Sequence, residues 1–118
     1  MSDTISWVVD VNIKPGQLNA FKGLVDELVA STRNEPNTLT YEYFLSADDV
    51  NCHIYERYAD SAAAMVHLGT FGQNFADRFL SMVDLNGIKV YGPVSEELQG
   101  AMGSMGAAFL GQFNGFAR

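Results

Sequence analysis

The alternation of strand-like and helix-like segments constrains the fold of this chain most. Residues 5–13 are rich in β-branched residues and end at Lys14-Pro15-Gly16, a turn that cannot continue a strand. Over residues 17–33 the apolar positions recur every three or four residues, which predicts an amphipathic helix. Residues 38–46 and 52–58 are aromatic and β-branched, and the short link between them is typical of a hairpin.

A second helical region, residues 61–83, follows the hairpin, and Asp60 is placed to cap its first turn. The region contains two glycines, and Thr70 followed by Gln73 has the form of a capping box. We therefore expect the helix to break there and a new helix to begin at Phe71.

A short fourth strand is predicted over residues 88–91, closed by Gly92-Pro93. The resulting order, β-α-β-β-α-β, is that of a ferredoxin-like sandwich of the α+β class, in which one sheet carries both helices on one face. Residues 1–92 are expected to form this domain, and residues 93–118 a C-terminal extension.

The other face of the sheet has no predicted cover. The two hairpin strands carry apolar residues at both alternating positions, as Tyr43 and Phe44 show on one strand and Ile54 and Tyr55 on the other. Neither face should therefore meet water. We predict a homodimer that buries sheet against sheet.

The C-terminal extension is predicted to begin with a short helix that Ser95 caps and that runs through Met102. A glycine-rich segment follows it and contains Phe109, Phe113 and Phe116. We expect these phenylalanines to pack on the body or on a partner, and a lid over a pocket is the alternative.

The composition of the chain argues against some classes of function. The formal charge of −7 and a pI near 4.5 argue against nucleic acid and anionic membrane surfaces. No apolar run reaches the roughly 18 residues of a membrane span, and the N-terminus lacks the pattern of a signal peptide, so a cytoplasmic protein is expected. Cys52 has no second cysteine to pair with, and a buried, inert thiol is favoured over a reactive one.

His67 is the first candidate for chemistry. Helical geometry places it near the edge of the apolar stripe that contains Met65 and Leu68, where it either lines a cavity or contacts water. Further along, Phe71 and Phe75 begin an aromatic ridge at intervals of four residues, which serves either as core or as the wall of a ligand pocket.

Three segments resemble the antibiotic biosynthesis monooxygenase family: IKPGQ at 13–17, EPNTLTY at 35–41 and YERYADSAAAMVHL at 55–68. Their order and spacing carry the resemblance, which spans about residues 5–92. It implies a dimeric α+β barrel with a cavity between sheet and helices. It also implies oxidation of phenolic or quinol-type aromatics by dioxygen, with no cofactor and no metal.

The resemblance implies roles for six residues. His67 matches the histidine of the family's A-H-L segment and is the candidate base or hydrogen-bond partner. Glu56 either orients the imidazole or forms a salt bridge with a cation. The remaining candidates contact the substrate, or in the case of the two tyrosines serve structure: Tyr41, Tyr58, Phe71 and Phe75.

The chain departs from the family pattern. Quinol-oxidising members have a second histidine five residues after the first, and that position is Gly72 here. The haem-degrading branch is disfavoured, because its tryptophan position aligns with His67 and its haem-ligating histidine with Asp77. No spacing of histidine and cysteine typical of a zinc site is present.

Two functions follow from these observations. The first is a cofactor-independent monooxygenase that oxidises a small phenolic, quinol or polyketide aromatic. The second is a dimeric barrel that binds an apolar small molecule without converting it, which the glycine at position 72 favours. The sequence leaves the substrate and the role of the extension open.

Overall fold

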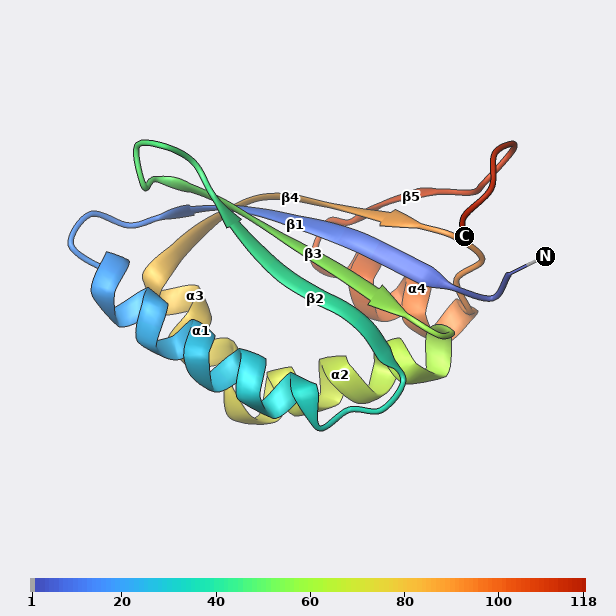
Figure 1. Cartoon of the computed structure of the whole chain (residues 1–118), viewed down its shortest axis with the longest axis horizontal. Helices are drawn as coiled ribbons and strands as arrows, with labels where there is room; N and C mark the ends of the chain where they lie inside the picture. Colours follow the sequence, from blue (N-terminus) through green and yellow to red (C-terminus); the bar gives the residue numbers. More distant parts are fainter. Residues whose placement is uncertain (1) are drawn as a thin grey trace.

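A computed structural model describes residues 2–118 as one open sheet with its helices on a single face (Figure 1). The strands are β1 (Ile5–Ile13), β2 (Thr38–Leu45), β3 (Asn51–Tyr58), β4 (Val83–Tyr91) and β5 (Ala108–Leu110). The helices are α1 (Leu18–Arg33), α2 (Ser61–Asn74), α3 (Ala76–Met82) and α4 (Glu96–Gly103). Within the described range, no helix is long and apolar enough to span a membrane.

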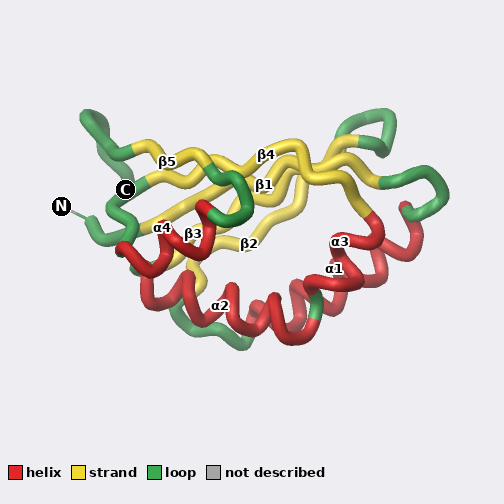
Figure 2. Tube along the Cα trace, turned by 180° about the vertical axis from the view of Figure 1, so that it is seen from behind, coloured by secondary structure: helices red, strands yellow, loops and turns green. Residues whose placement is uncertain are grey.

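The strand order in the sheet is β2-β3-β1-β4-β5, with β5 parallel to β4 and the other pairs antiparallel. This arrangement confirms the predicted ferredoxin-like α+β fold, and the sheet stays open rather than closing into a barrel. Figure 2 shows the same layers from behind, with the helices gathered under the sheet and the opposite face of the sheet free of helices.

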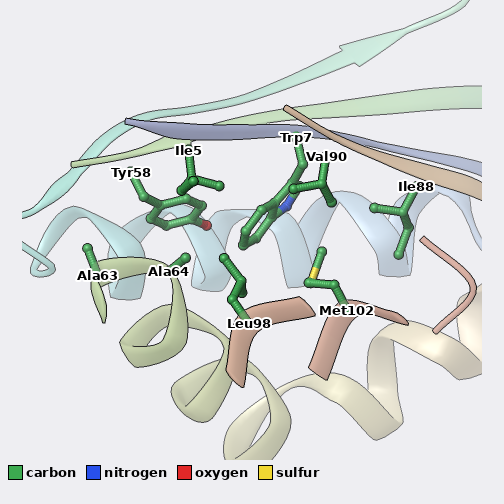
Figure 3. Packing of buried hydrophobic residues seen from close by; sticks show 9 residues of the cluster. All are labelled: Ile5, Trp7, Tyr58, Ala63, Ala64, Ile88, Val90, Leu98 and Met102. Atoms are coloured by element: carbon green, nitrogen blue, oxygen red, sulfur yellow. The ribbon is translucent and has the colours of Figure 1, made fainter. Parts of the chain in front are cut away.

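Two apolar clusters fill the space between sheet and helices. One lies over α1 and α3 and includes Phe21, Leu24 and Phe79. The other lies at the end of the sheet where both termini sit, and there Trp7 and Tyr58 pack on each other (Figure 3). Side chains of α4 close this second cluster from below: Leu98 and Met102.

The second helical region breaks later than predicted. α2 continues through the two glycines and Thr70 and ends at Asn74, and α3 begins after Phe75, whose φ and ψ are −130° and −25°. The predicted break at Phe71 is wrong. Gly69 and Gly72 have open space around them in the helix. Each glycine costs about 1 kcal/mol of helix stability, and the packing of the alanine-rich face of α2 outweighs this cost.

β4 begins earlier than the four residues predicted for it. The register between β1 and β4 skips Asn86, so this residue is the extra one in a β-bulge. Its side-chain amide donates to Asp10 Oδ1 and Asn12 Oδ1, both at 3.0 Å. These polar bonds hold a stretch whose sequence lacks strand-like alternation.

The extension joins the body through both of its elements. Ser95 caps α4, as predicted, because its hydroxyl accepts from the Leu98 N–H at 3.1 Å. Strand β5 then adds to the edge of the sheet beside β4, and Phe109 packs against the cluster around Trp7. Packing of the remaining tail on a partner stays a prediction.

Candidate active site

His67 faces the interior, and only 4% of it is exposed. The buried residues of α2 are Ala63, Ala64 and His67, so these three form its inward stripe, while Met65 and Leu68 flank it half-buried. The predicted position at the edge of the stripe is therefore wrong. The short alanine side chains define the face that meets the sheet, and the imidazole lies one turn further along that face.

A glutamate carboxylate lies beside each ring nitrogen of His67. Nδ1 lies 3.0 Å from Glu35 Oε1, and Nε2 lies 3.3 Å from Glu56 Oε1. All three side chains are at least 88% buried, since 5% of His67, 12% of Glu35 and 6% of Glu56 are exposed. The result is a buried carboxylate–imidazole–carboxylate cluster between the sheet and α2.

Glu56 sits at the centre of a hydrogen-bonded network on β3. The Tyr58 hydroxyl donates to Glu56 Oε1 at 2.5 Å, and the Trp7 indole N–H also donates to this carboxylate. Burial raises the pKa of Glu56, and the charge of His67 and these two donors offset only part of that rise. Glu56 therefore holds a proton more readily than an exposed glutamate does.

The geometry fixes how many protons the cluster holds. A protonated imidazole has two donors, whereas a neutral one has a single donor and a single acceptor nitrogen. With a carboxylate oxygen at each nitrogen of His67, either an imidazolium lies between two carboxylates or a neutral imidazole accepts from a protonated Glu56. The two forms hold the same number of protons and differ only in whether one of these protons lies on His67 or on Glu56.

Glu35 lies in the link after α1 and is held there by its own partner. The Thr38 hydroxyl donates to Glu35 Oε1 at 2.9 Å, at the start of β2. Sequence analysis noted this residue within the family-like segment at 35–41 and gave it no role. The carboxylate inside that segment was the only sign of a role for Glu35. Its partner His67 is 32 residues away in the chain, so the sequence did not show that the two side chains meet.

A pair of tyrosines extends the polar network along β2. The hydroxyls of Tyr41 and Tyr43 lie 2.6 Å apart, and the Tyr41 hydroxyl is also hydrogen-bonded to Thr32. Burial is the main cause that raises the pKa of Tyr41, Tyr43 and Tyr58, and the charge of Glu56 adds to it in each case. All three phenols therefore remain protonated at neutral pH. The Tyr58 hydroxyl donates to Glu56, and within the pair of Tyr41 and Tyr43 one hydroxyl donates to the other.

Most of the six predicted site residues come together. The rings of Tyr41 and Tyr58 lie 5.3 and 5.5 Å from the ring of His67, and Phe71 stacks over it at 6.4 Å. Phe75 lies apart, at the junction of α2 and α3, with the Arg78 guanidinium over its ring. Gly72 is on the exposed side of α2, so carboxylates rather than a second histidine are the partners of His67.

Two cavities of about 330 Å³ each lie away from the imidazole. One is on the helix-free face of the sheet, between Val8, Phe44 and Tyr55. The other lies between α1 and the β2 edge, and Phe21, Val25 and Tyr43 line it. Tyr43 thus contacts this second cavity and, through Tyr41, the surroundings of His67. Neither Phe71 nor Phe75 lines either of these two cavities.

Cys52 is not among the partners of His67. The thiol of Cys52 is buried, and burial raises its pKa to about 11, so it stays protonated and unreactive at neutral pH. Over residues 2–118, no group of three or more histidine, cysteine, aspartate or glutamate side chains is arranged to hold a metal ion.

An open α+β sheet with its helices on one face defines a ferredoxin-like fold, and a buried carboxylate–imidazole–carboxylate cluster lies between its sheet and α2. Residues 4–84 match the model of the antibiotic biosynthesis monooxygenase family, and the chain belongs to this family. The match ends inside β4, so α4 and β5 lie outside it. No curated protein sequence matches this chain significantly.

Several solved structures share the fold of this chain. MupZ from Pseudomonas fluorescens is 24% identical, with a TM-score of 0.89 over 100% of this chain and 91% of that one. A putative antibiotic biosynthesis monooxygenase from Nitrosomonas europaea is 20% identical, with a TM-score of 0.68 over 81% and 95%. SnoaB, a cofactor-independent oxygenase from Streptomyces nogalater, is 14% identical, with a TM-score of 0.68 over 80% and 96%.

Proposed function

We propose that this protein is a cofactor-independent monooxygenase that oxidises a small phenolic, quinol or polyketide aromatic with dioxygen. The observation that carries the proposal is the buried cluster of Glu35, His67 and Glu56, in which the imidazole lies between two carboxylates and can exchange a proton with them. Such a reaction begins with removal of a hydroxyl proton, because a phenolate gives an electron to dioxygen far more readily than the phenol. Membership of the family supports the same reaction type.

In this proposal His67 is the base and the glutamates are its positioning residues. The contact between Glu56 and Nε2 stays in place during the reaction, because Tyr58 and Trp7 hold the Glu56 carboxylate by hydrogen bonds. The substrate hydroxyl approaches Nδ1, where Glu35 is the more exposed carboxylate and lies in a link rather than in a strand. Glu35 takes the proton from Nδ1 as it moves aside, and the imidazole keeps its other proton on Nε2, toward the Glu56 carboxylate. Nδ1 then accepts the proton of the substrate hydroxyl.

The surroundings of His67 suit an aromatic substrate. Tyr41, Tyr58 and Phe71 surround the imidazole with rings and would exclude water from the reactive intermediate. In the overall reaction, one oxygen atom of O₂ enters the ring as a carbonyl. The other oxygen atom leaves as water, together with the two hydrogens that the substrate loses.

The proposed entry for the substrate is the cavity beside α1, because Tyr43 contacts it. Phe75 lies further along the same helical side.

Oxygen uptake with a panel of hydroquinones, combined with the mass of the product, tests the proposal. The wild type and His53→Gln should consume oxygen at equal rates, since His53 is the exposed histidine on the opposite face of the sheet. His67→Gln should lose about 10²-fold or more in kcat. Equal rates in all three proteins would refute a base role for His67.

A second function has an observation of its own. Both nitrogens of His67 are occupied and its ring is buried, which is also what a purely structural histidine requires. In that case the protein binds an apolar small molecule without converting it. Native mass spectrometry of the purified protein would then find a bound compound, and no hydroquinone would be consumed.

We also propose a homodimer that covers the helix-free face of the sheet. Exposed apolar side chains on or beside that face support it, among them Phe44, Tyr91 and Leu110. Equilibrium sedimentation at micromolar concentration should give twice the monomer mass of 12.9 kDa, and a folded monomer would refute the dimer.

A further inference from the structure

Three side-chain hydroxyls meet between the edge strand β2 and the helices. The hydroxyls of Tyr41 and Tyr43 lie 2.6 Å apart, and Thr32 of α1 is hydrogen-bonded to Tyr41. β2 contacts both α1 and α2 along this edge of the sheet (Figure 1). The three hydroxyls therefore lie on the same side of the sheet as His67.

These hydroxyls have more protons than they have hydrogen bonds. Each hydroxyl has one proton to donate. The contact between Tyr41 and Tyr43 uses one proton, and the contact between Tyr41 and Thr32 uses a second. Within residues 2–118, the side chains of these residues form no other hydrogen bond. One proton is therefore left without an acceptor in the protein.

The nearby carboxylates are engaged with other groups. Glu56 accepts from the Tyr58 hydroxyl and lies beside Nε2 of His67. Glu35 accepts from the Thr38 hydroxyl and lies beside Nδ1. The spare proton of the hydroxyls beside β2 therefore needs an acceptor from outside the protein, which is either a ligand or water.

The electrostatics of the site favour a neutral acceptor. Burial raises the pKa of Tyr41 and Tyr43, and the charge of Glu56 adds to the rise, so both phenols keep their protons. An anionic ligand group would be repelled by the carboxylates of Glu35 and Glu56. A carbonyl oxygen fits best, because it is neutral, accepts hydrogen bonds and has no proton of its own.

A ligand can reach the tyrosine pair through the cavity beside α1. Both tyrosines are half-buried, and Tyr43 lines this cavity of about 330 Å³, which is at the lower end of the range of ligand pockets. Lys22 and Asp26 also line it, but they have opposite charges and lie one turn apart on α1, so they add no net charge. The other walls are mainly apolar, among them Phe21, Val25 and Leu45.

Tyr41 connects the hydroxyl pair with the imidazole. Its ring lies 5.3 Å from the ring of His67, and its hydroxyl meets that of Tyr43. A compound of one or two rings whose hydroxyl faces Nδ1 can therefore carry a second oxygen toward the tyrosine hydroxyls.

We propose that Tyr41 and Tyr43 are specificity-determining residues that select a ligand with a carbonyl oxygen in addition to the hydroxyl that faces His67. The inference rests on the proposed function for the position of that hydroxyl. One phenol donates to the carbonyl oxygen, and the hydrogen bond between the two tyrosines fixes the position of the donor. A ligand without this oxygen leaves a donor unpaired, which lowers its affinity. The substrate class narrows from phenols and quinols in general to hydroxylated ring ketones.

A matched pair of ligands tests the proposal without turnover. A hydroxy-β-tetralone and the hydroxytetralin of the same skeleton differ by one carbonyl oxygen. A methylene group separates this carbonyl from the aromatic ring, so the two phenols have similar acidity. Isothermal titration calorimetry in the absence of oxygen should show that the wild type binds the tetralone at least about 10-fold more tightly.

Three variants assign the preference to the tyrosine pair. Tyr41→Phe/Tyr43→Phe removes both phenol donors, keeps both rings and should bind the two ligands with nearly equal affinity. Tyr55→Phe is the matched control, because it removes a hydroxyl on the helix-free face, and it should keep the wild-type preference. His67→Gln should weaken the binding of both ligands and leave the ratio of their Kd values unchanged. Circular dichroism should show that all variants fold.

The outcomes separate this proposal from the proposed function. Equal affinities of the two ligands for the wild type would overturn it and would mean that water is the acceptor. A preference that persists in the double variant, or a wild type that binds neither ligand, would overturn it as well. A preference for the tetralone without any oxygen consumption would refute the monooxygenase and leave the selection by the tyrosines standing. Oxygen consumption without the preference would do the reverse.

Discussion

Nδ1 of His67 lies 3.0 Å from Oε1 of Glu35, although 32 residues separate them in the chain. The link after α1 and the middle of α2 meet at this point, and Glu56 on β3 completes the cluster from the sheet. Each carboxylate is buried, and the imidazole between them is the partner that the two share.

Replacing His67 should lower the stability of the protein, and the loss should be smaller when the new side chain can hydrogen-bond to the two glutamates. His67→Ala leaves two buried carboxylates facing an empty space and should lower the free energy of unfolding by about 3–5 kcal/mol. His67→Gln keeps an amide that hydrogen-bonds to a carboxylate and should lose less. Urea unfolding at pH 7 measures both, and equal losses in the two variants would contradict this account.

Glu35→Gln should show whether the activity depends on the carboxylate beside Nδ1, because His67 itself is kept in this variant. The amide cannot balance a protonated imidazole, so we expect about a 10²-fold loss of kcat and a displaced pH–rate profile, with the protein still folded. Glu27→Gln is the matched control, since Glu27 pairs with Arg78 on the surface and such pairs contribute about 0–1 kcal/mol. An unchanged pH profile in Glu35→Gln would show that Glu35 serves packing alone.

Glu56→Gln should change how stability depends on pH. Burial raises the pKa of Glu56 above its ordinary value of 4.5, so the folded protein retains a proton that the unfolded chain releases. That contribution is fully present below about pH 4.5 and is lost as the pH rises through the folded value. The stability of Glu56→Gln relative to the wild type should therefore improve with rising pH. Urea titrations at several pH values that gave a constant difference would contradict the raised pKa.

Gly92→Ala should destabilise the end of β4. Gly92 has a φ of +115°, and an added Cβ would lie 2.6 Å from the Thr4 carbonyl oxygen. We expect a loss of at least about 1–3 kcal/mol. Gly100→Ala is the control, because Gly100 is inside α4 with open space around it, and there alanine should add about 0.5–1 kcal/mol. Thermal unfolding of both variants distinguishes the two positions.

Cys52 should resist thiol reagents in the folded protein. Its side chain is buried and its pKa is raised to about 11. A disulfide-exchange reagent at pH 8 should label it only after denaturant is added. Labelling of the native protein at the rate of a free thiol would contradict this burial.

Local pattern predicted the elements well where one periodicity dominates. The helix expected over residues 17–33 is α1, and the caps expected at Asp60 and Ser95 accept the N–H groups of Ala63 and Leu98. The break in the second helical region was misplaced because the capping pattern at Thr70 competes with the packing of the inward face of α2. Packing decides such a contest, since burial contributes more than a helix cap.

The sequence by itself predicted the order of the elements from β1 to α4, the ferredoxin-like topology and His67 as a candidate site residue, because periodicity and turn residues act over short distances. Only the tertiary structure showed which groups surround His67. Its burial follows from how α2 rotates against the sheet, and its partnership with Glu35 joins segments 32 residues apart. Such contacts depend on the three-dimensional path of the chain.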